Sequence, residues 1–336
     1  MRYIGGKSQM TKYIMEVIQQ YTHNVETITD IFSGSGVVAR TLKAAGYGTI
    51  ANDLLYFSYA LNKGILCNNE TTSHIRDLLS YLNNLPTDKA DPCNPVNFIA
   101  FNYAPNPHTQ RMYLQQQNAL KIDVIRQEIE RIKGDLTENE YFYLLASLVS
   151  AVPYVSNITG TYAAYLKYWD ARTFKTLTLQ ELPLVISSQQ CEVYNEDALE
   201  LIQHTQADIV YLDPPYNTRE YLPNYHLLET IARYDYPEIK GVTGMRATNQ
   251  TKSDFCKKAK VYGAFKNILT NAQCKYILLS YNNEGLLPTE EIVLLMQDCG
   301  VKESFRLFEY DYRRYKSKIP NNAEGLKEQL YFIQKY

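Results

Sequence analysis

The chain has 336 residues, of which 45% are hydrophobic and 21% charged, so it has room for one large domain or two smaller ones and is not a disordered chain. Its formal net charge of −2 excludes a uniformly basic nucleic-acid binder, so any basic surface must be local. The six cysteines are scattered, with no C-x-x-C pair and no cluster among the five histidines, which predicts reduced thiols in a cytoplasmic protein and no metal site.

The N-terminal segment contains a double glycine followed by a lysine, Gly5-Gly6-Lys7. Apolar residues then recur from Met10 to Tyr21 at the spacing of one helix face and predict the first helix. The free N–H groups and the dipole at the start of this helix would suit binding of an anion or a carboxylate. The alternative is that Gly5-Gly6-Lys7 is simply a flexible terminus. The segment lacks the apolar core of a signal peptide, and no apolar run approaches the ~20 residues of a membrane span, so no membrane partner is expected.

A strand, a glycine turn and a helix come next, and together they predict the first half of a Rossmann-type unit. Residues 27–32 alternate in polarity and include β-branched side chains, which predicts the strand. The turn is Ser33-Gly34-Ser35-Gly36, and a helix over residues 37–45 would end at Gly46. The glycines would let a ligand approach the backbone closely. Because the turn is neither G-x-G-x-x-G nor a Walker motif, it favours a nucleoside ligand smaller than a dinucleotide or a triphosphate.

An acidic residue follows the second predicted strand, residues 48–51, in the pair Asn52-Asp53. Asp53 follows Asp30 by roughly 20 residues, which is the offset at which an acid meets the ribose hydroxyls of a bound nucleoside in this fold. We therefore expect Asp53 to bind a ribose.

The composition changes at Asn83-Asn84-Leu85-Pro86, a segment of loop-forming residues that predicts a domain boundary. We expect residues 83–184 to form an inserted, mainly helical domain. Residues 1–82 and 185–336 would then form one discontinuous α/β domain.

Two helices are predicted within the insert. Apolar residues at helical spacing predict the first over residues 110–133. A capping box from Thr137 to Glu140, followed by apolar residues through Val149, predicts the second.

Three segments combine basic, polar and aromatic residues in a way that suits nucleic acid, because cations contact phosphates and rings stack on bases or sugars. They are residues 156–175, the basic segment 240–266 with seven Lys and Arg against one acid, and a loop over 313–318. The candidate nucleic-acid-contacting residues are Asn157, Tyr162, Lys167, Arg246, Lys252, Arg313, Arg314, Lys316 and Lys318. A solvated amphipathic surface would have a similar composition and is the alternative.

The sheet resumes after the insert. Apolar runs predict strands over residues 191–194, 209–212 and 276–280, and a C-terminal hairpin would pair residues 305–312 with 329–333. We therefore predict an α/β fold with a Rossmann-like sheet, mostly parallel with an antiparallel C-terminal hairpin, plus the helical insert.

The strand over residues 209–212 ends in Asp213-Pro214-Pro215-Tyr216, where neither proline can continue a ladder. Ligands bind outside the carboxyl ends of strands in open α/β sheets. An exocyclic base amine is a poor nucleophile because its lone pair is delocalised, and Asp213 and the Pro214 carbonyl could accept both amino hydrogens and free that lone pair. The two prolines would fix the carbonyl, and Tyr216 would offer a stacking face. The alternative is a strand that merely ends in a Pro-Pro turn.

The order of these motifs, Gly-Gly-Lys, Phe-Ser-Gly-Ser-Gly, Asn-Asp, a long insert and Asp-Pro-Pro-Tyr, resembles the Dam-like, α-group N6-adenine DNA methyltransferases over nearly the whole chain. The resemblance implies S-adenosyl-L-methionine as methyl donor, double-stranded DNA with a flipped target adenine as substrate, and the insert as target-recognition domain. A restriction-modification system is one setting for such an enzyme, with a cognate restriction endonuclease as candidate partner.

The resemblance also implies roles for individual residues. Asp213, Pro214, Pro215 and Tyr216 match the catalytic motif of the family. The residues implied in cofactor binding are Tyr3, Lys7, Phe32, Ser33, Gly34, Ser35, Gly36, Asp53, Asp197 and Asp213. Two positions depart from the family pattern, Tyr3 in place of a Trp and Ala198 in place of the aromatic residue that often follows the acid.

Two other functions fit the sequence. The first is methylation of another amine, by a ribosomal-RNA methylase or an N4-cytosine enzyme, although the long insert favours DNA adenine. The second is a catalytically silent nucleic-acid-binding module that keeps the fold. An intact Asp213-to-Tyr216 motif beside an intact Asp53 argues against the silent module, because folding needs neither.

Overall fold

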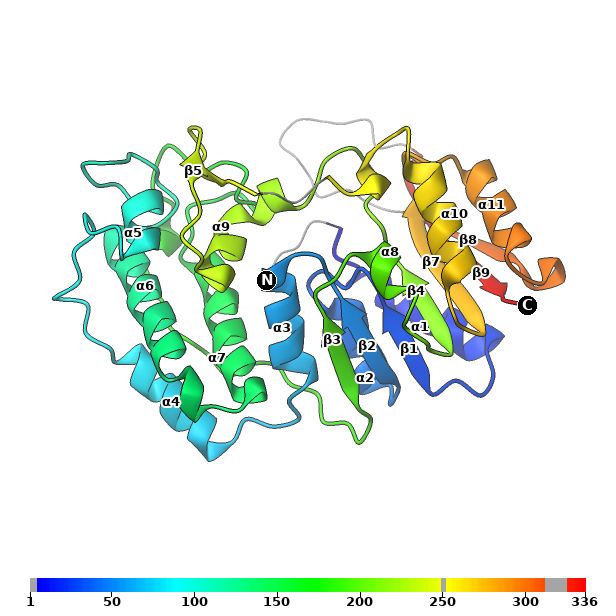
Figure 1. The fold of residues 1–336 in the computed structure, drawn as a ribbon, viewed down its shortest axis with the longest axis horizontal. Coiled ribbons are helices and arrows are strands. Elements are labelled where there is room, and N and C mark those ends of the chain that lie inside the picture. Colours follow the sequence, from blue (N-terminus) through cyan, green and yellow to red (C-terminus); the bar gives the residue numbers. More distant parts are fainter. Residues whose placement is uncertain (1–4, 249–251, 312–324) are drawn as a thin grey trace.

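A mixed β-sheet forms the centre of one half of the molecule (Figure 1). The structure, a computed structural model, describes residues 5–248, 252–311 and 325–336. Within these residues the sheet has seven strands in the order β3-β2-β1-β4-β7-β9-β8; the first five are parallel, and β9 is antiparallel to both β7 and β8. The strands are β1 (Thr27–Asp30), β2 (Gly48–Asn52), β3 (Cys191–Tyr194), β4 (Ile209–Leu212), β7 (Tyr276–Asn282), β8 (Arg306–Asp311) and β9 (Lys327–Gln334). The predicted sheet, mostly parallel with an antiparallel C-terminal hairpin, is confirmed.

Helices bury both faces of this sheet. They are α1 (Thr11–Tyr21) and α2 (Val37–Ala44) on one face, and α8 (Ala198–Leu201), α10 (Val261–Asn271) and α11 (Thr289–Asp298) on the other. Along β4, Ile209 and Tyr211 pack under the first pair, whereas Val210 and Leu212 pack under the second group. Successive strand residues face opposite sides, so a central strand covered on both sides needs a continuous apolar run.

The other half of the molecule is mainly helical (Figure 1). Its helices are α3 (Tyr56–Leu66), α4 (Ser73–Asn83), α5 (Phe98–Tyr103), α6 (Gln116–Arg131), α7 (Glu138–Ala151) and α9 (Leu222–Arg233), and α9 is followed by the small hairpin of β5 (Ile239–Lys240) and β6 (Met245–Arg246). Short 3-10 helices occur in this half at η1 (Lys133–Asp135), η2 (Val152–Tyr154) and η3 (Ala171–Phe174), and in the sheet half at η4 (Asp254–Cys256) and η5 (Lys302–Ser304). One apolar core joins α3, α7 and α9, so segments before and after residues 83–184 contribute to it.

The structure confirms the predicted start of one insert helix and contradicts that of the other. The capping box of α7 is confirmed: Thr137 accepts the Glu140 N–H at 3.3 Å, and the Glu140 carboxylate accepts the Thr137 N–H at 2.9 Å. The predicted start of α6 at residue 110 was wrong, because the helix begins at Gln116. Arg111 instead donates to the carbonyls of Asn102 and Gly241, and so holds this stretch as a loop between α5 and the β5–β6 hairpin.

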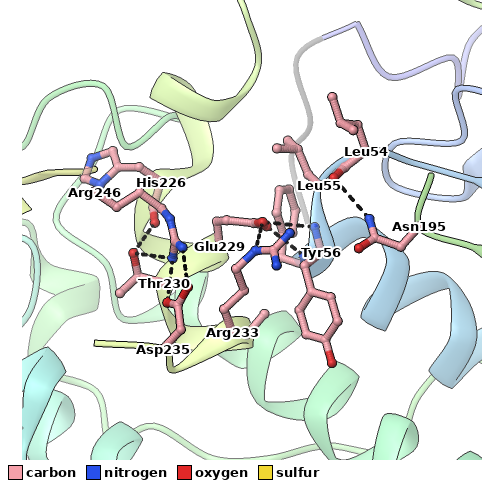
Figure 2. Close-up of polar contacts among 12 residues, drawn as sticks. Leu54, Leu55, Tyr56, Asn195, His226, Glu229, Thr230, Arg233, Asp235 and Arg246 are labelled. Atoms are coloured by element: carbon pink, nitrogen blue, oxygen red, sulfur yellow. Dashed lines mark hydrogen bonds and ion pairs between the residues drawn. The ribbon is translucent and has the colours of Figure 1, made fainter. Parts of the chain in front are cut away.

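Glu229 of α9 ties that helix to the start of α3 (Figure 2). Helix α3 has no side-chain cap of its own, and the buried Glu229 carboxylate accepts the N–H groups of Tyr56 at 3.1 Å and Phe57 at 2.9 Å. Arg233 donates to the same carboxylate at 2.6 Å. On the sheet side, Asn195 donates to the Leu54 carbonyl at 3.0 Å. The segment after Asp53 is therefore held from both halves of the molecule.

Candidate active site

Three acidic residues meet at the carboxyl edge of the sheet. Asp30 ends β1, Asp53 follows β2, and Asp213 follows β4. These strands are parallel neighbours, so their carboxyl ends lie at one edge, where ligands bind in open α/β sheets. The structure thus confirms the prediction that the Asp213-to-Tyr216 motif directly follows the carboxyl end of a strand.

Asp213 belongs to a compact polar cluster with Lys7, Tyr216 and Glu328. Lys7 Nζ lies 3.1 Å from Asp213 Oδ1 and 2.5 Å from Glu328 Oε1, and it also contacts the Tyr216 hydroxyl. The Tyr216 hydroxyl is 2.7 Å from Asp213 Oδ1 and 2.6 Å from Glu328 Oε1. Its single proton serves one of these carboxylates at a time. The ammonium of Lys7 is therefore shared between two carboxylates.

The pKa values of both Asp213 and Lys7 are raised in this cluster. Burial, together with the Glu328 charge, raises the pKa of Asp213 to about 6, although Lys7 acts to lower it. Burial lowers the pKa of Lys7, but Asp213 and Glu328 raise it by more, so its net pKa lies above the ordinary lysine value. At neutral pH Lys7 is a cation and Asp213 is mostly a carboxylate.

A cavity of about 370 Å³ lies beside this cluster, over the glycine turn. Seven residues predicted to bind the cofactor line it together with Asp213: Lys7, Phe32, Ser33, Gly34, Ser35, Asp53 and Asp197. Gly36 shapes the turn without lining the cavity; its φ is 72°, and a Cβ there would come within 1.9 Å of the Asn62 Oδ1 atom. Tyr3 lies outside the described residues, so its cofactor contact stays a prediction.

The acidic side chains of this cavity differ in how they are bonded. Asp53 accepts the Gly34 N–H at 2.9 Å and the Leu55 N–H at 2.8 Å, and burial raises its pKa to about 7. Asp197 accepts the Leu199 N–H at 2.8 Å and so caps α8. Asp30 is buried, and neither of its carboxylate oxygens has a hydrogen-bond partner among the described residues. Burial, together with the charges of Asp213 and Asp53, raises the pKa of Asp30 well above its ordinary value, and a cationic ligand group beside it would favour the ionised form.

A larger cavity, of about 1080 Å³, opens on the other side of the motif. It shares Lys7 and Pro215 with the smaller cavity and is also lined by Tyr216 and Glu328. Its remaining wall comes from both halves of the molecule and carries the cations Arg40, Lys175 and Arg219. The motif therefore stands where the two cavities meet.

Three of the predicted DNA-contacting residues are buried in the protein. Asn157 donates to the Leu166 carbonyl at 2.9 Å, the Tyr162 hydroxyl lies 3.1 Å from the Ser156 hydroxyl, and Arg246 forms an ion pair with Asp235 at 2.7 Å (Figure 2). Their polar groups serve internal contacts, so we no longer assign Asn157, Tyr162 or Arg246 to DNA. A polar and aromatic composition is shared by interior hydrogen-bond networks and by nucleic-acid surfaces.

The other predicted DNA contacts remain predictions. Lys167 and Lys252 are exposed, and Lys252 lines the smaller cavity rather than the larger one. Arg313, Arg314, Lys316 and Lys318 lie outside the described residues. In the described part of the chain, no group of three or more metal-ligating side chains occurs and no helix is long and apolar enough to cross a membrane.

Glu328 and Ser280 are site residues that the motifs do not predict. Both are buried, and Ser280 Oγ donates to Glu328 Oε1 at 2.9 Å between neighbouring strands β7 and β9. The sequence offers one signal for Glu328, which is a charged residue within the largely buried strand β9. An unpaired charge is costly in such a place, so a charged residue there indicates a partner.

Comparison with known proteins decides the family. Residues 3–294 match the model of the D12 class N6 adenine-specific DNA methyltransferases. The chain belongs to this family. Its members depend on S-adenosylmethionine, and the resemblance inferred from the motif order is thereby confirmed.

Individual relatives agree with this membership. The chain is 42% identical to the type II methyltransferase M.FokI of Planomicrobium okeanokoites, over all of this chain and 53% of that protein. It is 38% identical to the modification methylase StsI of Streptococcus sanguinis, over all of this chain and 52% of that protein. It is 34% identical to the type II methyltransferase M.NlaIII of Neisseria lactamica, over all of this chain and 99% of that protein. The chain thus spans about half the length of the first two relatives.

Proposed function

We propose that this chain transfers a methyl group from S-adenosyl-L-methionine to the N6 amine of an adenine flipped out of double-stranded DNA. The observation that carries the proposal is the position of the motif between the two cavities, since Asp213 lines the smaller one, Tyr216 the larger one and Pro215 both. The methyl donor, bound in the smaller cavity, and the flipped adenine, entering from the larger cavity, would meet at this motif. Such alignment of two reactants supplies much of the rate in methyl transfer.

The smaller cavity has the chemistry that the donor requires. Gly34 and Gly36 adopt positive φ values of 50° and 72°, which favour glycine, so the turn has no side chain at these two positions. The unpaired Asp30 suits a cationic group, and Asp53 still has lone pairs for ribose hydroxyls. When bound, S-adenosylmethionine would supply an electrophilic methyl group on a sulfonium sulfur. We assign Lys7, Ser33, Asp53 and Asp197 to its binding.

The residues of the motif would prepare the amine for attack. Asp213 and the Pro214 carbonyl would accept the two N6 hydrogens, which localises the nitrogen lone pair. The freed lone pair would then attack the methyl group that the bound donor supplies, so that a nitrogen–carbon bond would replace the carbon–sulfur bond, whose electron pair would stay on sulfur. Asp213, with a pKa of about 6, is a base within reach of the proton that the methylated nitrogen loses. The Tyr216 ring lines the larger cavity, where it would stack on the base.

The test of this proposal is methylation of duplex DNA by the purified protein with labelled S-adenosylmethionine, followed by digestion to nucleosides. We expect label in N6-methyladenine. We also expect that Asp213→Ala abolishes transfer while retaining part of the cofactor binding, because the cavity has other contacts. Undiminished transfer by this variant would overturn the mechanism. Label in N4-methylcytosine or only in RNA would overturn the adenine assignment, and no transfer by the unmodified chain would favour the silent module.

We further propose residues 83–184 as the target-recognition domain, extended by α9 and the β5–β6 hairpin, which pack into the same helical half. The relatives' names as type II methyltransferases and modification methylases support a restriction-modification role with a cognate endonuclease as partner. We place the protein in the cytoplasm, because all six cysteines are free. Sequencing the methylated bases in DNA from cells that express the chain would identify its recognition site.

A further inference from the structure

We propose that Glu328 is a positioning residue for methyl transfer, which holds Lys7 and Tyr216 on one oxygen of Asp213 and leaves the other oxygen for the substrate amine. The inference rests on the proposed function and adds to the catalytic motif a residue 115 positions away along the chain. Glu328 and Asp213 share Lys7 and Tyr216 as partners, so Glu328 acts on Asp213 through these two side chains and through its own charge.

The first observation is the convergence of donors on Glu328. It lies on β9 with 2% of its surface exposed, and Oε1 meets Lys7 at 2.5 Å, the Tyr216 hydroxyl at 2.6 Å and Ser280 Oγ at 2.9 Å. Ser280 and Glu328 are diagonal neighbours across the β7–β9 ladder, since Ser280 pairs with Leu330. The position of the carboxylate is therefore fixed by the sheet itself, which is more rigid than a loop.

The second observation is the asymmetry at Asp213. Both of its partners, Lys7 at 3.1 Å and Tyr216 at 2.7 Å, meet Oδ1. Within the described residues no hydrogen bond or ion pair reaches Oδ2, and the side chain is 17% exposed and lines the smaller cavity. Oδ2 is thus the acceptor that remains for an incoming amine.

The third observation is the charge balance. Glu328 and Asp213 share one ammonium, that of Lys7. Without the Glu328 charge, Lys7 would pair with Asp213 alone and Tyr216 would lose one of its two carboxylate partners. The Tyr216 ring would still pack against Tyr281, with ring centres 4.9 Å apart, so the aromatic wall would persist while the carboxylate lost its alignment. Small misplacements of a reacting group cost large factors in rate.

The variant Glu328→Gln tests this proposal, because it keeps the shape of the side chain and removes only its charge. We expect kcat to fall by at least about tenfold, with the KM for DNA and the affinity for S-adenosylmethionine changed by less than about threefold. Glu309→Gln is the matched control, since Glu309 lies on neighbouring β8 in an exposed pair with Lys327. We expect the control to match the unmodified chain in kcat and KM.

The pH profile separates positioning from simple structural loss. The titratable and charged groups that act on Asp213 or are acted on by it are Lys7, Asp30, Tyr211, Tyr216, Tyr221 and Glu328. Because the Glu328 charge raises the pKa of Asp213, its removal should move the acidic limb of kcat to lower pH in the variant. If kcat falls in Glu328→Gln but the acidic limb of its pH profile stays where it is in the unmodified chain, the proposal is overturned.

A second variant keeps the proposal testable if Glu328→Gln fails to fold. Ser280→Ala removes one donor to the Glu328 carboxylate without changing any charge. We expect it to fold, bind S-adenosylmethionine and lose about two- to tenfold in kcat, less than Glu328→Gln. The proposal is overturned if kcat is unchanged in both variants. If Glu328→Gln does not fold, an unchanged kcat in Ser280→Ala alone overturns it. If the unmodified chain methylates a different amine, the adenine assignment fails while the Glu328 comparison still stands.

Discussion

Asp213 is the residue whose ionisation should set the pH range of the enzyme. Burial raises its pKa to about 6, and only the ionised carboxylate can take up the proton that the methylated nitrogen loses. Transfer should therefore be half-maximal near pH 6 and fall about tenfold for each further unit of acidification. Lys7 keeps its proton across this range, since its pKa is raised.

The measurement is kcat for methyl transfer between pH 5 and 8 at saturating DNA and cofactor. The folded protein should be monitored over the same range, so that unfolding is not read as titration. A rate that stays level from pH 7 to 5 would contradict the role of an ionised Asp213.

Sequence reasoning identified Asp213 but not Glu328, for a physical reason. Two prolines after an apolar run mark a strand end locally, so Asp213 can be located without knowledge of the fold. Glu328 is significant only because β9 inserts antiparallel beside β7, which brings it to the mouth of β4. Burial likewise separates Asn157 and Arg246 from a nucleic-acid surface, and composition does not reveal burial.

Among the elements, the junction of α3 and α9 depends on Glu229 (Figure 2). Glu229→Ala would leave the N–H groups of Tyr56 and Phe57 without their acceptor and Arg233 without its partner. We expect a loss of about 3 kcal/mol in the free energy of unfolding, measured by urea denaturation. Glu238→Ala is the control, because Glu238 forms an exposed pair with Lys240 and its loss should change little. Equal stability of the two variants would refute the capping role.

His226, also on α9, should make folding sensitive to acid. Burial lowers its pKa from 6.5 to about 4, and its Nε2 atom lies 2.8 Å from the Tyr162 carbonyl. Because the folded-state pKa is below the unfolded value, its stabilising contribution is present above pH 6.5 and is lost as the pH falls toward 4. Between pH 7 and 5 this contribution should fall by about 2 kcal/mol.

The comparison with His226→Gln isolates this effect, because Gln can also donate to the Tyr162 carbonyl but does not titrate. The free energy of unfolding should fall between pH 7 and 5 by about 2 kcal/mol more in the unmodified chain than in the variant. The same pH dependence in both proteins would show that His226 is not the titrating group.

The elements themselves were predictable where the pattern was local. The glycine turn, β4 and the capping box of α7 each carry a signal within a few residues. Helix α3 has no counterpart among the predicted elements, because it is apolar on most sides and its first turn is capped from α9, far along the chain. A helix buried on most sides loses the amphipathic period by which sequence reasoning detects it.

At the scale of the whole molecule, the arrangement of the two halves decides how DNA could reach the motif. The larger cavity is lined by the sheet half and the helical half together, and it borders the smaller cavity at Lys7 and Pro215. A net charge of −2 gives the chain no general attraction for DNA, so the cations of this cavity should carry a large share of the binding.

Lys175 and Arg219 test this arrangement from opposite halves, because both are exposed, line the larger cavity and lie on segments far apart in sequence. If each neutralises one phosphate, Lys175→Ala with Arg219→Ala should reduce the slope of log K against log salt by about 2. Fluorescence anisotropy with a duplex at several salt concentrations gives the slope. The control pair is Lys12→Ala with Lys302→Ala, since neither residue lines the larger or the smaller cavity. If both pairs change the slope equally, the larger cavity is not where the DNA backbone lies.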